Sequence, residues 1–122
     1  MRVVICGSRD WADREIIRSW VAKLPADAEV AHGAARGADT IAGEEAEARG
    51  LRVVRYPADW KALGNAAGPI RNRQMLDSFK PAVVFAFTDR LMRGDRLTGT
   101  GDCVAAALER GIRCTIVPSG GA

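Results

Sequence analysis

Three glycine-rich segments of this 122-residue chain carry arginine, hydroxyl and carboxylate side chains beside their glycines. Glycine lets a main chain approach a phosphate closely, and arginine binds phosphate oxygens through two parallel N–H groups. The first N–H groups of a helix also attract anions. These residue types therefore predict a site for a phosphate-bearing molecule. The segments are Gly7-Ser8-Arg9-Asp10, His32-Gly33-Ala34-Ala35-Arg36-Gly37-Ala38-Asp39 and Leu97-Thr98-Gly99-Thr100-Gly101-Asp102.

A fourth segment, Gly68-Pro69-Ile70-Arg71-Asn72-Arg73, places two arginines at the start of a predicted helix. Arg71 could clamp a phosphate there or orient a sugar. The alternative is that Arg71 and Arg73 cap loops or pair with Asp77.

Two aromatic residues, Tyr56 and Trp60, precede this segment. Either could stack on a base, although such side chains more often anchor a loop or a core. The chain contains no Gly-Lys-Ser/Thr P-loop and no GxGxxG fingerprint, so the phosphate prediction depends on the glycine-rich segments acting together.

Short apolar runs alternate along the chain with segments whose apolar residues recur at helical spacing. Continuous apolar runs are typical of strands that are buried on both faces of a parallel sheet. We expect strands at Val3–Cys6, Glu29–His32, Val53–Tyr56, Ala82–Phe87 and Ile112–Val117. We expect helices over residues 13–24, 38–49, 69–79 and 100–110, a loop over 57–70 and a polar stretch over 88–99.

Residue types at the predicted junctions support these boundaries. Asp10 and Asp13 stand where a capping pair would open the first helix, and Thr100 stands where it would cap the last one. Gly50 and Gly111 each follow a helix and precede a strand, which predicts left-handed glycine caps.

Strands and helices that alternate five times predict the α/β class. We expect a single Rossmann-like domain over residues 1–118, with about five parallel strands and helices on both faces, followed by a flexible tail at 119–122. The C-terminal ends of parallel strands share one edge, where open α/β sheets bind ligands. The glycine-rich segments are therefore expected to meet at that edge.

The composition excludes several classes of protein. Hydrophobic residues make up 48% and charged residues 27% of the chain, as in globular proteins and unlike disordered or coiled-coil chains. The net charge of +3 permits a phosphate-bearing partner without requiring one. No apolar run is long enough for a membrane span or a secretory leader, so we expect a cytoplasmic protein without membrane contact.

The histidine and cysteine content argues against a metal site. His32 is the single histidine of the sequence, and zinc-type ligand clusters are absent, so no metal and no cofactor are predicted. Cys6, Cys103 and Cys114 are expected to be reduced, buried thiols. A nucleophilic Cys103 is the alternative, but no histidine stands beside it in the sequence to activate it.

The motifs, taken in order, resemble the YspA/YpsA-related branch of the SLOG superfamily over about residues 2–117. The resemblance implies a Rossmann-like fold and a nucleotide or nucleotide-derived ligand. It is carried by Gly-Ser-Arg-Asp from Gly7, His-Gly-Ala-Ala-Arg-Gly-Ala-Asp from His32, Pro-Ala-Asp-Trp from Pro57, Gly-Pro-Ile-Arg-Asn from Gly68 and Gly-Thr-Gly-Asp from Gly99.

Two related families suggest different activities. LOG enzymes cleave the N-glycosidic bond of nucleoside 5′-monophosphates, and their Arg-Lys-x-x-Met helix start is similar to Arg71–Met75. Their Gly-Gly-x-Gly-Thr-x-Glu-Glu loop is matched incompletely, because Asp102 and Cys103 stand in place of the two glutamates. The DNA-processing protein A family binds single-stranded DNA, and its Gly-x-Ala-Arg-Gly-x-Asp segment is similar to Gly33–Asp39.

The main hypothesis is therefore a module that binds a nucleotide-type small molecule as a sensor or a sequestering protein, without turnover. The residues expected to bind the ligand are Gly7, Ser8, Arg9, Gly33, Ala34, Arg36, Gly37, Asp39, Asn72, Gly99 and Thr100.

The first alternative is a LOG-like hydrolase. In that reading Asp102 stabilises the positive charge that develops on the sugar, as glycosidase carboxylates do, and Arg71 orients Asp102 or holds the substrate. The second alternative is single-stranded DNA binding, which the aromatic content of 6% and the small net charge argue against. The sequence leaves open whether the chain pairs with itself as a homodimer.

Overall fold

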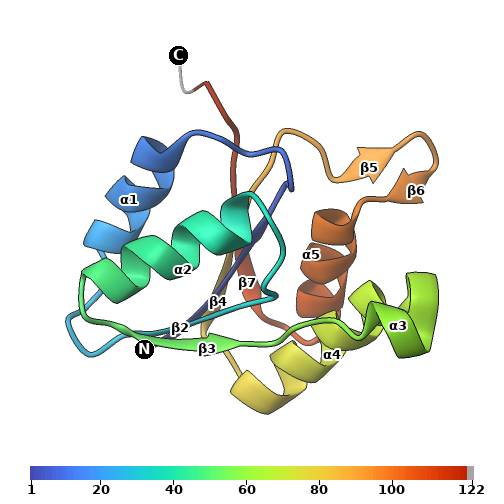
Figure 1. The fold of residues 1–122 in the computed structure, drawn as a ribbon, viewed down its shortest axis with the longest axis horizontal. Helices are drawn as coiled ribbons and strands as arrows, with labels where there is room; N and C mark the ends of the chain where they lie inside the picture. The colour runs from blue at the N-terminus through green and yellow to red at the C-terminus, as the bar shows by residue number, and fades with distance from the viewer. Residues whose placement is uncertain (121–122) are drawn as a thin grey trace.

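Five parallel strands form the central sheet of the computed structural model, which describes residues 1–120. These strands are β1 (Arg2–Gly7), β2 (Glu29–His32), β3 (Arg52–Arg55), β4 (Val83–Phe87) and β7 (Arg113–Val117). Their order across the sheet is β3-β2-β1-β4-β7 (Figure 1). The predicted α/β, Rossmann-like architecture with about five parallel strands is confirmed.

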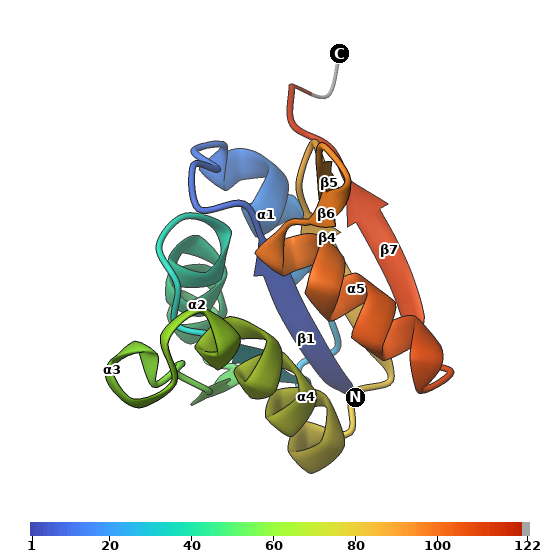
Figure 2. The ribbon, with the colours of Figure 1, turned by 90° about the vertical axis from the view of Figure 1, so that its right-hand side faces the viewer.

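Two helices cover each face of the sheet (Figures 1 and 2). On one face lie α1 (Arg14–Ala22) and α2 (Ala38–Ala48), and on the other lie α4 (Ala67–Phe79) and α5 (Gly99–Glu109). Successive side chains of a strand point to opposite faces. Val3 and Ile5 of β1 consequently pack in the first layer, whereas Val4 and Cys6 pack in the second. Burial on both faces explains why the strands are continuous apolar runs.

The predicted loop over 57–70 is wrong in part, because it contains a short helix, α3 (Trp60–Leu63), and a 3-10 turn, Gly64–Ala66. Asp59 opens α3 by accepting the N–H of Ala62 at 3.1 Å. The prolines and glycines of this stretch favour a loop, and the local aspartate cap prevails over them for one turn. Helix α4 begins at Ala67, which places Pro69 in its first turn, as expected.

The polar stretch over 88–99 contains a small antiparallel hairpin of β5 (Met92–Arg93) and β6 (Arg96–Leu97), which the sequence analysis did not predict. Gly94 turns the hairpin at a φ of +64°. After the hairpin the chain enters α5, and Thr98 caps this helix by accepting the N–H of Gly101 at 2.9 Å. Thr100 is buried inside the first turn, so its predicted capping role is wrong.

Other junctions agree with the predictions. Asp13 caps α1 by accepting the N–H of Ile16 at 3.3 Å. Gly50 and Gly111 have φ angles of +83° and +71°, as left-handed caps require. Of the predicted tail, residues 121–122 lie outside the described residues, and the N–H of Ser119 donates to Asp89 at 2.8 Å. Within residues 1–120, none of the helices is both long and apolar enough to span a bilayer.

Gly7 lies where β1, β4 and the start of α2 are close together. A Cβ atom on Gly7 would lie 2.4 Å from the carbonyl oxygen of Phe87 and 2.5 Å from the Cβ of Ala38. The absence of a side chain therefore sets the spacing between the sheet and the start of α2.

We expect Gly7→Ala to lower the free energy of unfolding by about 1–3 kcal/mol, because the backbone of β4 and the start of α2 must shift to admit the methyl group. Urea unfolding measures this change. Gly99→Ala is the matched control, because a Cβ on Gly99 would meet no atom within 4 Å. Equal stability of the two variants would contradict the close approach.

Candidate functional site

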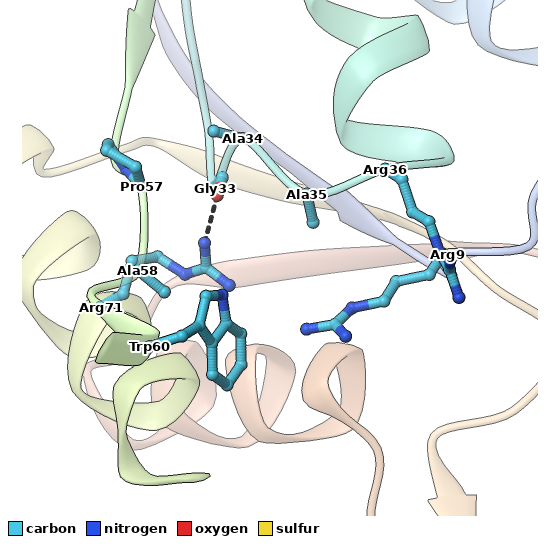
Figure 3. Close-up of a pocket in the computed structure, with 9 residues that line it drawn as sticks. All are labelled: Arg9, Gly33, Ala34, Ala35, Arg36, Pro57, Ala58, Trp60 and Arg71. Atoms are coloured by element: carbon cyan, nitrogen blue, oxygen red, sulfur yellow. Dashed lines mark hydrogen bonds between the residues drawn. The ribbon is translucent and has the colours of Figure 1, made fainter. Parts of the chain in front are cut away.

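A cavity of about 430 Å³ opens at the C-terminal edge of the sheet, beside the loops that follow β1, β2 and β3 (Figure 3). Its volume lies in the range of small-molecule sites. Helix α3 and the start of α4 close its other side. The lining residues are Arg9, Gly33, Ala34, Ala35, Arg36, Pro57, Ala58, Trp60 and Arg71.

Three arginines from different segments surround this cavity: Arg9 follows β1, Arg36 follows β2, and Arg71 stands on α4. None of the three has a carboxylate partner within ion-pair distance among residues 1–120. No carboxylate lines the cavity either. The three guanidinium groups therefore gather at the cavity without a close carboxylate partner among the described residues, and the nearest buried carboxylate that acts on Arg71 and Arg9 is that of Asp39, behind the wall.

Arg71 is held in place by neutral acceptors. Its Nη1 donates to the carbonyl oxygen of Gly33 and, at 3.3 Å, to that of Tyr56. Its Nε donates to the side-chain oxygen of Asn72 at 3.0 Å. Figure 3 shows the guanidinium reaching up to Gly33 from α4. These bonds fix the position of the guanidinium without neutralising its charge.

Asn72 connects Arg71 to the start of α5. Its buried Nδ2 donates to Asp102 at 3.0 Å and to the carbonyl oxygen of Gly99 at 3.3 Å. Asp102 also forms an ion pair with Arg73 at 3.0 Å. Arg71 thus reaches Asp102 only through Asn72, and Asp102 does not line the cavity. The alternative pairing with Asp77 is made by neither arginine, because Asp77 pairs with Arg110 at 2.6 Å.

The loop from Gly33 to Gly37 is folded by two buried side chains. Asp39 accepts the N–H groups of Gly33 and Ala35 at 3.0 and 3.3 Å. His32 accepts the N–H of Ala34 at 2.9 Å through Nδ1, and Ala34 adopts a left-handed φ of +58°. These three amides are occupied inside the protein, so the loop contributes shape to the cavity and the arginines contribute the charge.

The loop after β1 is locked against the start of α2. The N–H of Ala38 donates to the carbonyl oxygen of Ser8 at 3.1 Å. Gly37 has a φ of +77°, and a Cβ there would lie 2.4 Å from the same oxygen. The hydroxyls of Ser8 and Thr88 lie 2.7 Å apart. Gly7, Ser8, Gly37 and Asp39 consequently lie outside the cavity lining and support the wall.

The structure divides the expected ligand residues into three groups. Arg9, Gly33, Ala34 and Arg36 line the cavity, together with Arg71 of the hydrolase alternative, and the four wall residues form another group. The third group gathers at the start of α5, where Asn72 and Thr100 are buried and Gly99 is exposed.

Trp60 lines the cavity, although it was not among the expected ligand residues. The indole is 47% exposed and lines the cavity, whereas an anchoring role predicts burial. The Pro-Ala-Asp-Trp segment that ends at Trp60 was the available signal. Tyr56 instead places its hydroxyl 3.3 Å from that of Ser78.

Burial shifts the pKa values of both loop-folding side chains. Desolvation raises the pKa of Asp39 to about 6, although its two N–H donors and the charges of Arg71 and Arg9 act in the opposite direction. Desolvation, followed by the charge of Arg55, lowers the pKa of His32 to about 4. At neutral pH, therefore, Asp39 is ionised and His32 is neutral.

The chain is similar in sequence to one protein family and to a phage protein. A sequence model described as the YspA, cpYpsA-related SLOG family matches residues 1–62, which contain the first two glycine-rich loops. The gene 61 protein of Mycobacterium phage D29 is 35% identical over 120 residues, with 91% of each chain covered.

The fold is similar to that of DNA processing protein A from Streptococcus pneumoniae, with a TM-score of 0.72 at 19% sequence identity. The match covers 98% of this chain and 51% of the other, so the chain spans about half the length of that protein. At this level of identity the likeness supports a shared fold.

The two shifted pKa values predict opposite effects of pH on stability. Asp39 titrates near 3.8 when unfolded and near 6 when folded, so its contribution falls as the pH rises between these values. His32 titrates near 6.5 when unfolded and near 4 when folded, so its contribution rises over that interval. In the unmodified protein the two effects largely cancel.

We expect Asp39→Asn to leave the effect of His32 unopposed. The free energy of unfolding should then fall by up to about 3 kcal/mol as the pH is lowered from 6.5 to 4. His32→Gln should leave the effect of Asp39 unopposed, so that the free energy of unfolding falls as the pH is raised from 3.8 to 6. Urea unfolding at several pH values measures both. A variant whose pH profile matches that of the unmodified protein would show that the substituted group does not titrate as described.

Proposed function

The chain belongs to the YspA, cpYpsA-related SLOG family, and on this basis we propose that it binds a nucleotide or nucleotide-derived anion in the arginine-lined cavity. The observation that carries the proposal is that Arg9, Arg36 and Arg71 line one cavity and that none of them forms an ion pair within the described residues. Guanidinium groups bind phosphate oxygens in a bidentate manner, and a guanidinium group that is not paired with a carboxylate keeps its charge for a ligand.

The geometry favours binding without turnover over N-glycosidic cleavage at Asp102. A carboxylate that stabilises a sugar cation must face the substrate. Asp102 is instead bound by Arg73 and Asn72 and lies outside the cavity lining. We therefore assign Asp102 a positioning role: through Asn72 it holds the helix that carries Arg71.

DNA binding is a second candidate because the hairpin after β4 carries its own unpaired charge. Arg93 and Arg96 are directly opposite each other and exposed, and they have no carboxylate partner within the described residues. Like charges in such positions destabilise a hairpin, so an anionic partner would stabilise it. The similarly folded Streptococcus pneumoniae protein is named for DNA processing.

We expect the four nucleoside 5′-monophosphates to include at least one that binds, and Arg36→Gln to weaken that binding about tenfold or more, because a charge-assisted hydrogen bond is lost. Isothermal titration calorimetry measures the affinity. Arg113→Gln, at an exposed arginine on β7 outside the cavity, is the matched control. Equal effects of the two substitutions, or no binding by any nucleotide, would contradict the proposal.

Chromatography of the same samples tests turnover. Recovery of the intact nucleotide after prolonged incubation is expected, and release of free base would identify a hydrolase.

Titration with a single-stranded oligonucleotide separates the second candidate from the first. DNA binding predicts an affinity that falls steeply between 50 and 200 mM salt and that is lost in the Arg93→Gln/Arg96→Gln variant. For the cavity proposal, the double variant should leave nucleotide binding unchanged. Fluorescence anisotropy measures the oligonucleotide affinity, and salt-independent or absent binding would exclude this candidate.

A further inference from the structure

Trp60 is an exposed aromatic surface at a charged cavity. It begins the four-residue helix α3, which is capped by Asp59. The benzo end of its indole packs toward Gly68, where a Cβ would lie 3.3 Å from the ring. Nearly half of the side chain remains accessible, with 47% exposed. Gly68 thus supports the ring from α4 and leaves indole surface for another group.

Arg9 covers that surface in this structure. Its guanidinium carbon lies 5.1 Å from the centroid of the indole ring, within the range of a cation–π contact. Figure 3 shows Arg9 extending across the cavity from the loop after β1 toward Trp60. The two residues therefore connect opposite walls of the site.

The separation of Arg9 and Trp60 leaves no space for a flat ring between them. An intercalated base needs about 3.5 Å on each of its two faces, or roughly 7 Å in total. A base can stack on the indole at this place only after Arg9 moves. The side chain of Arg9 is exposed and has no ion-pair partner among the described residues, so few contacts oppose that movement.

Resting on the proposed function, we propose that Trp60 is the stacking platform for the base of the ligand and that Arg9 is exchanged from the indole to the phosphate when a nucleotide binds. Base–aromatic stacking is stronger than an exposed cation–π contact, so the base displaces Arg9. The released guanidinium then joins Arg36 and Arg71 as a phosphate ligand. The chemical class of the ligand is therefore an aromatic base joined to a phosphorylated sugar.

The exchange makes the site bind a whole nucleotide more tightly than its nucleoside or its sugar phosphate. A nucleoside displaces Arg9 but offers it no anion in return. A sugar phosphate offers the anion but cannot stack. Only a molecule with both parts gains the two interactions, so the site favours nucleotides over either fragment.

The test uses calorimetry with three probes: the tightest-binding nucleoside monophosphate, its nucleoside and ribose 5-phosphate. Trp60→Ala is expected to weaken nucleotide binding about tenfold without weakening ribose 5-phosphate binding, because the variant loses the stacking surface and leaves Arg9 free for the phosphate. Trp60→Phe should restore most of the loss. Leu63→Ala, at an exposed position of the same helix, is the matched control and should leave the affinities for the nucleotide and for ribose 5-phosphate unchanged.

Arg9→Gln tests the exchange itself. Removing the guanidinium uncovers the indole, so the nucleoside should bind several-fold more tightly while the nucleotide binds more weakly. These opposite shifts are not expected from a residue that only maintains the loop. Weaker or unchanged nucleoside binding in this variant would overturn the exchange.

The remaining outcomes distinguish this inference from the proposed function. If Trp60→Ala leaves nucleotide binding unchanged while Arg36→Gln weakens it, the platform is overturned and the nucleotide site stands. If Trp60→Ala weakens nucleotide and ribose 5-phosphate binding equally, Trp60 is structural and the platform is likewise overturned. If no nucleotide binds to the unmodified protein, the proposed function fails and the platform fails with it.

Discussion

The buried carboxylate of Asp39 is the group on which the candidate site depends. Its Oδ2 accepts the N–H groups of Gly33 and Ala35, and it turns the chain between β2 and α2. Burial opposes the ionised form and raises its pKa to about 6. The two N–H groups and the charges of Arg71 and Arg9 oppose that rise. The loop and the arginines therefore stabilise the same carboxylate, which ties the shape of the cavity to its charge.

A second set of polar contacts joins the cavity to the start of α5. Arg71 binds the carbonyl oxygen of Gly33, Asn72 accepts from Arg71 and donates to Asp102, and Arg73 neutralises Asp102. Each donor in this series has an acceptor, as a buried polar network requires. The starts of α4 and α5 and the loop after β2 are thereby held together, and Arg71 is presented to the cavity from a rigid support.

The sequence was sufficient for the sheet, because parallel strands that are buried on both faces are recognisable as continuous apolar runs. It also located the glycine-rich loops at the edge where β1, β2 and β4 end. The sequence did not predict which main-chain N–H groups are already hydrogen-bonded inside the protein. The Gly33 loop was expected to offer N–H groups to an anion, but Asp39 and His32 occupy them. These pairings are local in the sequence, but they depend on the backbone conformation of the loop, which the residue types do not specify.

The separate roles of Arg71 and Arg73 follow from helical geometry. Residues two positions apart on a helix do not face each other, so one arginine meets the Gly33 loop while the other meets Asp102. Had both faced the cavity, Asp102 would lack its ion pair; had both faced α5, the cavity would lose a charge. In the proposed site, guanidinium groups and not fixed amides would contact the ligand, so recognition would depend on side chains that can reorient. Selectivity then depends on which charges are already fixed, as Arg71 is, and which are free to move, as Arg9 is.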